Sequence, residues 1–198
     1  MFQRARRRLS GGYFMRTHEI SRLKVYFLVI LATALALVVI FGISRYRRIH
    51  AYDDIIAKTA ANHGLAPKLI RAVIWRESGF KYDRRGRRGE IGLMQVTENA
   101  AKEWAEANGI VNLRKNDLFN PETNIQAGTW YLKRSISRWS NKTNPLPYAL
   151  AEYNAGRSNT MRWAASDGGD PNKFWDGITY PSTKRYVRDI LTRLRRYR

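Results

Sequence analysis

The chain has 198 residues, of which 44% are hydrophobic and 12% aromatic, and this is enough apolar surface to exclude an intrinsically disordered chain. Cysteine is absent, which excludes a disulfide scaffold, a thiolate nucleophile and a cysteine-ligated zinc site. Lys and Arg number 36 against 16 Asp and Glu, so the formal net charge is +20. The three histidines, His18, His50 and His63, are too scattered to indicate a metal cluster.

One strongly apolar segment lies near the N-terminus. Residues 25–43 contain no charged side chain, and a helix of that length rises roughly 28 Å, close to the hydrocarbon thickness of a bilayer. A cleaved signal peptide is the alternative, but its apolar region usually has only about 7–15 residues and ends in a small-x-small cleavage site. This segment is longer and continues into Ser44-Arg45-Tyr46-Arg47-Arg48. We therefore expect an uncleaved transmembrane anchor.

The basic residues that flank this segment predict its orientation. Seven Lys and Arg residues precede it and three follow it closely, and the side with more basic residues usually faces the cytoplasm. We expect residues 1–24 to be a basic cytoplasmic segment, residues 44–51 a linker and residues 52–198 a domain outside the cytoplasm. Clustered arginine also admits nucleic-acid binding, but no recognisable nucleic-acid motif accompanies it. Beside an anchor, lipid headgroups are the nearer polyanion, and no nucleic-acid partner is expected.

The remaining residues predict one compact, all-α or α-dominated domain, because helical spacing recurs and alternating strand patterns are nearly missing. Proline at first helical positions, capping residues and terminal glycines mark the ends of the elements. Helices are expected from Asp53 to Asn62, from Pro67 to Ser78, after Thr97 as far as Asn108, from Asn120 to Trp139, from Pro147 to Asn154, and through Val187, Ile190, Leu191 and Leu194 near the C-terminus. A glycine-containing loop over residues 84–92 lies between the second and third of these helices.

Glu77 is the first candidate for chemistry. On the helix from Pro67 it falls in the middle of the apolar stripe of Ile70, Val73 and Ile74. A carboxyl group on an apolar face favours its neutral form, so its pKa rises, as a general acid working near neutral pH requires. The structural alternative is that Glu77, near the helix end, turns outward and pairs with a neighbouring base such as Lys81.

Five motifs follow one another along the sequence, and the first of them begins with this glutamate. They are Glu77-Ser78-Gly79-Phe80, Gly92-Leu93-Met94-Gln95-Val96, the segment from Asn120 to Leu132, Ala149-Leu150-Ala151-Glu152-Tyr153-Asn154-Ala155-Gly156, and the segment from Tyr180 to Val187. In this order and spacing they resemble the soluble-lytic-transglycosylase (SLT) catalytic domain family over about residues 52–195. The resemblance implies a lysozyme-like fold that cleaves peptidoglycan glycan strands.

The resemblance also implies roles for individual positions. Glu77 matches the single catalytic glutamate, which acts first as general acid and then as general base. The implied substrate-binding positions are Ser78, Glu90, Gly92, Leu93, Met94, Gln95, Tyr153 and Asn154. The Tyr153 hydroxyl is expected near the catalytic carboxyl group. By residue type alone, Leu93 and Met94 are more typical of a plain hydrophobic core. Tyr153 is also typical of a half-buried aromatic residue whose hydroxyl finds a partner.

Three positions depart from the family's habit. Gly86 stands where members usually carry Ser, Glu90 where they usually carry Ala, and Ser182 where they usually carry Glu. The loop Arg84-Arg85-Gly86-Arg87-Arg88 is unusually basic. It is either a solvated surface loop or a contact for the lactyl or stem-peptide carboxylates of peptidoglycan.

The sequence therefore favours a membrane-anchored peptidoglycan lytic transglycosylase. The resemblance implies that Glu77 protonates the bridging oxygen between N-acetylmuramic acid and N-acetylglucosamine, that the substrate's 2-acetamido group stabilises the oxocarbenium, and that Glu77 then deprotonates the 6-hydroxyl to form a 1,6-anhydro ring. No metal or organic cofactor is expected. The expected partners are glycan strands and the membrane. The expected location is the bacterial cytoplasmic (inner) membrane, with the domain facing the periplasm or cell wall, and the oligomeric state is left open.

Two other functions fit the same residues. A hydrolytic muramidase would need a second carboxylate about 5–9.5 Å from the first, and Asp83, Glu90 and Glu152 are the candidates near it in sequence. A non-catalytic wall-binding module is the second possibility, supported by Gly86 and Ser182 and opposed by the presence of Glu77 and Tyr153.

Overall fold

The computed structural model describes residues 6–165 and 167–196, with side chains from residue 22 onward. The chain forms two compact units, Met1–Arg47 and Arg48–Arg198. The expected basic segment lies largely before residue 22, so the side chains of Arg4 to Arg16 fall outside the described residues.

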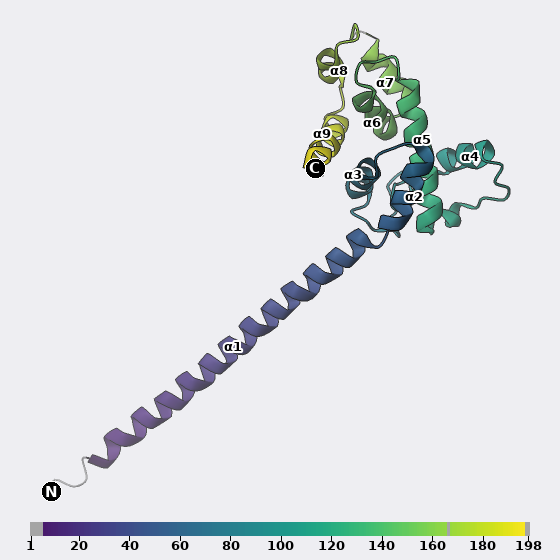
Figure 1. Ribbon diagram of the computed structural model, residues 1–198. Coiled ribbons are helices and arrows are strands. Elements are labelled where there is room, and N and C mark those ends of the chain that lie inside the picture. The colour runs from purple at the N-terminus through teal and green to yellow at the C-terminus, as the bar shows by residue number, and fades with distance from the viewer. Residues whose placement is uncertain (1–5, 166, 197–198) are drawn as a thin grey trace. The chain divides into compact units, whose positions relative to one another are not determined.

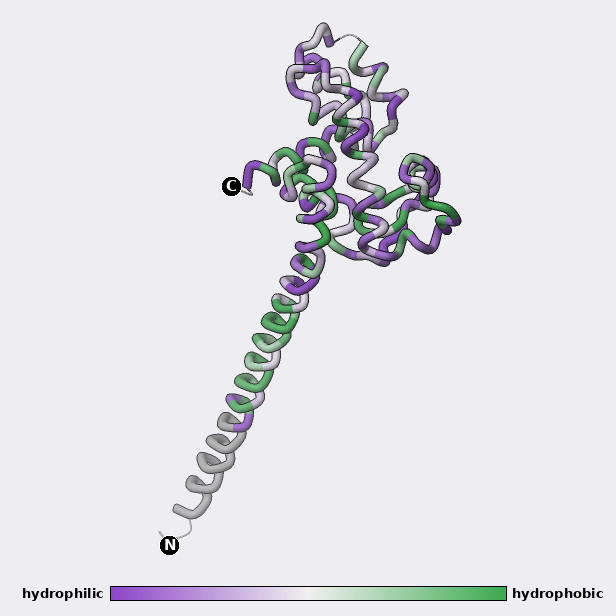
Figure 2. Tube along the Cα trace, turned by 45° about the vertical axis from the view of Figure 1, so that its right-hand side comes forward, coloured by the Kyte–Doolittle hydropathy of each residue, from purple (hydrophilic) through white to green (hydrophobic). Residues whose placement is uncertain are grey.

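The first unit is formed by α1 (Arg6–His50). Its side chains between Val25 and Ile43 are exposed and mostly apolar, and Figure 2 shows them as a continuous hydrophobic stretch. Within the described residues, one helix is long and apolar enough to cross a membrane, and none of its most apolar window is buried in the protein. The helix continues through residues 44–50 of the segment 44–51 that was predicted as a linker, and no proline interrupts it there.

The second unit is built from helices, and the prediction of an α-dominated fold is confirmed. The elements are α2 (Asp53–His63), α3 (Pro67–Glu77), α4 (Glu98–Ala107), the 3₁₀ helix η1 (Lys115–Phe119), α5 (Pro121–Arg138), α6 (Pro145–Ala155), α7 (Arg157–Ala164), α8 (Pro171–Gly177) and α9 (Pro181–Arg196). Between α3 and α4 the described chain has two isolated antiparallel bridges, which join Ile91 to Arg85 and to Val96. The sequence did not predict η1, α7 or α8 as helices, and α6 begins two residues before Pro147.

Capping residues explain the helix ends that the sequence predicted. The Thr97 side chain accepts a hydrogen bond from the backbone N–H of Ala100 (3.2 Å), and Asn120 accepts one from that of Thr123 (3.1 Å). These bonds satisfy N–H groups that the first helical turn leaves without partners. Gly64 ends α2 in a left-handed conformation with φ = 61°, which glycine adopts without steric cost.

The domain is organised around α5, which packs against α2, α4, η1 and α6 (Figure 1). The α9 helix closes the other side by packing on α3 and α6. Ile70, Val73 and Ile74 have no exposed surface, so the apolar face predicted for α3 is the face that enters the core. This packing brings the C-terminal end of α3, the middle of α5, the end of α6 and the first turns of α9 around one cleft.

Candidate active site

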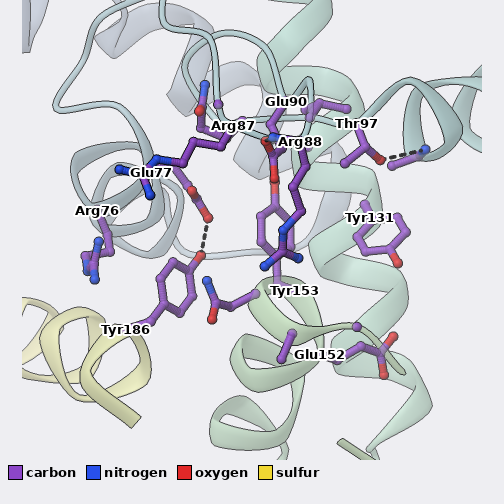
Figure 3. A pocket seen from close by; sticks show the side chains of 18 of the residues that line it. Arg76, Glu77, Arg87, Arg88, Glu90, Thr97, Tyr131, Glu152, Tyr153 and Tyr186 are labelled. Carbon is purple, nitrogen blue, oxygen red and sulfur yellow. Dashed lines mark hydrogen bonds between the residues drawn. The ribbon is translucent and has the colours of Figure 1, made fainter. Parts of the chain in front are cut away.

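A cleft of about 420 Å³ lies among these helices and the loop between α3 and α4, within the usual size of ligand-binding sites. Figure 3 shows Glu77 on one side, Tyr153 and Tyr131 on the other, Tyr186 below, and Arg87, Arg88 and Glu90 entering from the loop. The side chains predicted for the site that line it are Glu77, Glu90, Gln95, Tyr153 and Asn154.

Glu77 is the last residue of α3, and its carboxyl group is turned into the cleft. Its Oε1 accepts a hydrogen bond of 2.6 Å from the Tyr186 hydroxyl of α9. Burial raises the pKa of Glu77 from its ordinary value of 4.5 to about 7, against the opposing effects of the Tyr186 hydrogen bond and of Arg76. The desolvation cost of the charged form therefore decides the direction. The alternative in which Glu77 turns outward to pair with a neighbouring base is not what the structure shows.

Tyr186 is the residue of this site that sequence reasoning missed. It lies within the motif from Tyr180 to Val187, but 109 positions separate it from Glu77 in the sequence. The two residues meet because α9 packs on α3. Its side chain is 1% exposed, and burial together with the Glu77 charge raises its pKa well above 10. The hydroxyl therefore stays protonated and acts as a donor. Arg76, which lies over the Tyr186 ring, pairs with Asp189 at 3.1 Å and further fixes α9 to α3.

The loop from Ile91 to Val96 is held from below by one buried asparagine. Asn124 of α5 is 1% exposed; it accepts a hydrogen bond from the Met94 N–H (2.8 Å) and donates to the carbonyls of Ile91 and Leu118 (both 2.8 Å). Gly92 has φ = 81°, and a Cβ atom at this position would lie 2.3 Å from the Asn124 amide nitrogen. A side chain there would displace the asparagine, so the glycine is required by close packing.

Gln95 stands at the cleft end of this loop. It has φ = 50°, a sparsely populated conformation for a residue other than glycine, and such conformations occur preferentially at functional sites. Its side-chain amide donates to the carbonyls of Gly92 (2.9 Å) and Arg84 (3.2 Å). These bonds hold the strained backbone in place.

Tyr153 of α6 lines the cleft opposite Glu77. Its hydroxyl donates to the Met94 carbonyl at 2.9 Å, so the bond to the Glu77 carboxyl group is made by Tyr186 and not by the tyrosine that was expected near it. Burial and the Glu77 charge raise the pKa of Tyr153 well above 10. A Cβ atom on Gly128 of α5 would lie 2.7 Å from the Met94 sulfur and 3.1 Å from the Tyr153 hydroxyl, so glycine permits this contact.

Asn154 links the cleft to α9. Its side-chain oxygen accepts a hydrogen bond of 2.8 Å from the hydroxyl of Thr183, which is 1% exposed. Ser182, the neighbouring departure from the family pattern, is exposed and does not line the cleft.

The other two departures, Gly86 and Glu90, lie against each other. A Cβ atom on Gly86 would be 2.2 Å from Glu90 Oε2, so the Glu90 carboxylate occupies the space that a side chain at position 86 would need. The same oxygen accepts a hydrogen bond from the Arg88 backbone N–H (2.9 Å). A side chain at position 86 would therefore have to displace the flexible end of the Glu90 side chain from where it lies.

Four of the predicted substrate-binding residues do not reach the cleft. Ser78, Gly92, Leu93 and Met94 are buried and absent from its lining. Leu93 and Met94 are core residues without exposed surface, and the Ser78 hydroxyl donates to the Ile74 carbonyl at 3.2 Å. These residues shape the cleft from behind.

The other carboxylates near Glu77 differ in how free they are to act. Glu152 is buried and accepts hydrogen bonds from the side chains of Ser135 (3.0 Å) and Trp139 (2.8 Å). It also forms an ion pair with Arg138. Asp83 is exposed and does not line the cleft. Glu90 is thus the second carboxylate that enters the cleft from the described residues. No group of three His, Cys, Asp or Glu side chains suited to a metal occurs in the described part of the chain.

The raised pKa of Glu77 predicts a pH-dependent penalty to stability. The native pKa of about 7 exceeds the ordinary 4.5, so the unfolded chain loses this proton first and stability falls as the pH rises from about 4.5 to 7. A pKa difference of this size corresponds to about 3 kcal/mol. We expect Glu77→Gln to be as stable as the wild type at pH 4 and more stable, by up to about this amount, at pH 8.

Thermal unfolding of the full chain in detergent, followed by tryptophan fluorescence, measures this effect. All six tryptophans lie within residues 48–198, so the signal reports on the second unit. The matched control is Glu106→Gln, an exposed carboxyl group, for which the difference from wild type should not change with pH. A pH-independent difference for Glu77→Gln would show that the carboxyl group is not desolvated.

Comparison with known proteins agrees with this geometry. Residues 54–175 match the Transglycosylase SLT domain family. The chain is 34% identical over 139 residues to the membrane-bound lytic murein transglycosylase F of Desulfosudis oleivorans. The matched region covers 67% of this chain and 28% of that protein. In structure it resembles an inactive glutamate-to-glutamine mutant of the lytic transglycosylase Slt from Pseudomonas aeruginosa, with a TM-score of 0.66, 28% identity and coverage of 75% of this chain and 24% of that one.

The 70 kDa soluble lytic transglycosylase of Escherichia coli gives a TM-score of 0.68 at 27% identity, over 75% of this chain and 24% of that chain. The chain thus spans about a quarter of the length of these relatives. The matched residues include most of the second unit and all of the cleft helices except α9. The chain belongs to the Transglycosylase SLT domain family, and its second unit has that family's lysozyme-like fold.

Proposed function

We propose that the protein is a peptidoglycan lytic transglycosylase, and that Glu77 is its catalytic residue. One observation carries the proposal: a carboxyl group facing the cleft has a pKa of about 7 because it is buried. Such a group is partly protonated near neutral pH and can both give and take a proton. The lytic activity named for the relatives from Desulfosudis oleivorans and Escherichia coli supports this chemistry.

The reaction needs one protein carboxyl group. Protonated Glu77 donates its proton to the oxygen that bridges N-acetylmuramic acid and N-acetylglucosamine, while the bond from that oxygen to the muramyl anomeric carbon breaks. The 2-acetamido carbonyl of the substrate stabilises the positive charge. Glu77, now a carboxylate, takes the proton of the muramyl 6-hydroxyl as its oxygen bonds to the anomeric carbon. The substrate supplies the nucleophile, a recognised exception to the two-carboxylate rule.

The surroundings of Glu77 suit both halves of this cycle. Burial favours the neutral acid before the first transfer. The hydrogen bond of 2.6 Å from Tyr186 stabilises the carboxylate after it, since a donor favours the charged form of its acceptor. A glutamate-to-glutamine change accompanies loss of activity in the Slt protein of Pseudomonas aeruginosa, which supports an essential glutamate carboxyl group.

A hydrolytic muramidase is the second candidate function, and Glu90 is the observation that favours it. Its carboxylate lines the same cleft, and its charge contributes to the raised pKa of Glu77. A water molecule held by Glu90 could attack the anomeric carbon in place of the 6-hydroxyl. Against this, one Glu90 oxygen already accepts a hydrogen bond from the Arg88 backbone N–H. This contact suits a residue that stabilises the loop better than a general base that activates water.

The products of cleavage distinguish the two reactions. We expect the full chain in detergent to release muropeptides with 1,6-anhydro ends, about 18 Da lighter than the hydrated products because no water is added. Glu77→Gln should lower the rate by at least about 10²-fold, whereas Glu90→Gln should keep the anhydro product. Mass spectrometry of digested sacculi measures both outcomes. Predominantly hydrated reducing ends, lost together with Glu90, would instead identify a hydrolase.

We further propose that α1 anchors this catalytic domain to the bacterial cytoplasmic membrane. The exposed apolar side chains of residues 25–43 would be costly in water and are accommodated by the hydrocarbon region of a bilayer. The basic residues before them favour a cytoplasmic N-terminus, residues 1–24, with the domain from residue 52 facing the periplasm or cell wall. The name of the relative from Desulfosudis oleivorans supports a membrane-bound enzyme.

The orientation can be tested with reporters fused after Arg198. We expect alkaline phosphatase, which is active outside the cytoplasm, to be active in this fusion and a cytoplasm-dependent fluorescent reporter to be dark. The matched control carries both reporters after Lys24, before the apolar segment, where the pattern should reverse. A cytoplasmic C-terminus would contradict both the orientation and a role at the cell wall.

A further inference from the structure

Three arginines from the loop between α3 and α4 form one edge of the cleft. Arg84, Arg87 and Arg88 all line it, and all three are exposed to solvent. We call this set the arginine edge. Figure 3 shows Arg87 and Arg88 entering the cleft from the loop. The charge of Arg84 reaches Glu77, because it opposes the rise in the pKa of that carboxyl group.

The arginine edge carries positive charge that the described protein does not neutralise. The other arginine of the cleft, Arg76, is paired with Asp189, and Glu152 is paired with Arg138. Within the described part of the chain, no ion pair with a carboxylate joins Arg84, Arg87 or Arg88. Glu90 and the partly ionised Glu77 are the remaining acids of the cleft, so cations are in excess at the place where a substrate would lie.

The backbone under the arginine edge is held in a fixed form. The Gly86 N–H donates to the Glu90 carbonyl (2.7 Å), the Gly92 N–H to the Arg84 carbonyl (2.8 Å), and the Arg88 N–H to the Glu90 carboxylate (2.9 Å). A loop closed by these bonds loses little entropy when a ligand binds, which favours recognition. The Glu90 carboxylate therefore holds the loop backbone at Arg88.

We propose that the arginine edge binds carboxylates carried by the N-acetylmuramic acid units of the glycan strand. The inference rests on the proposed function, since it concerns the substrate of that same cleft. N-acetylglucosamine is neutral, whereas each muramyl unit bears a lactyl group or the stem peptide attached to it, and both are sources of carboxylate. Guanidinium groups bind carboxylates by paired, charge-assisted hydrogen bonds. The edge thus selects anionic strands and sets which sugar lies beside Glu77.

Binding can be measured without cleavage in the full chain carrying Glu77→Gln, held in neutral detergent. The probes are soluble glycan strands in three forms: with stem peptides, with the peptides removed by an amidase so that the lactyl carboxylate is free, and with all carboxylates converted to neutral methylamides. The test variant adds Arg87→Gln and Arg88→Gln. The matched control adds Arg162→Gln and Arg185→Gln, two exposed arginines outside the cleft lining.

We expect the test variant to raise Kd by about tenfold or more for at least one carboxylate-bearing form, equivalent to roughly 1.4 kcal/mol, and to leave the Kd of the neutral strands unchanged. The form that responds identifies the lactyl group or the stem peptide as the source. The control pair should change each Kd by less than about twofold, because exposed charges outside the site contribute little. An unchanged Kd for both anionic forms, or an equal loss for neutral strands, would overturn the proposal.

A second measurement needs no substitution in the loop. For the Glu77→Gln chain, the Kd of the responding strands should rise as NaCl increases from about 50 to 300 mM, since salt screens exposed charges, whereas that of methylamide strands should stay constant. Equal salt responses would also overturn the proposal. Because these assays follow binding alone, a strand that binds as expected but that the wild-type chain does not cleave would count against the proposed reaction and leave this inference standing.

Discussion

The site depends on one carboxyl group that is partly withdrawn from water at the edge of the core. Glu77 ends α3 on the same helical face that supplies Ile70 and Ile74 to the core, so its carboxyl group is directed inward and its pKa rises to about 7. The helix would be more stable with a neutral side chain at this position. The fold tolerates the cost because the packing of α3 against α9 is extensive and places a tyrosine hydroxyl 2.6 Å from the carboxyl oxygen.

The rest of the cleft is arranged around this group by residues that never reach it. Asn124, buried beneath the loop, fixes Met94 and Ile91, and Met94 in turn accepts the Tyr153 hydroxyl bond. Glycine at position 128 gives that contact its space. The catalytic proposal therefore depends on core packing as much as on the groups that line the cleft, and substitutions in either set should disturb the same geometry.

Helical periodicity placed Glu77 on the apolar stripe of its helix but left open whether the carboxyl group turns inward or outward. Capping signals predicted α2 to α5 closely, because they depend on residues close together in sequence. The bond from Tyr186, the close contact of Gly86 with Glu90 and the burial of Ser78 could not be predicted in this way. Each depends on how the chain folds back on itself. Short polar helices such as α7 also escaped, since they carry too few apolar positions to show a period.

The most direct test is to titrate the Glu77 carboxyl group itself. Carbon-13 NMR of the glutamate-labelled full chain in detergent, with the resonance assigned by its loss in Glu77→Gln, gives the pKa. The account predicts a value of about 7 in the wild type and a higher value in Tyr186→Phe, because that change removes a donor to the carboxylate but keeps the burial. Tyr180→Phe, at an exposed tyrosine, should leave it unchanged. A wild-type pKa near the ordinary 4.5, or a fall in Tyr186→Phe, would contradict the account.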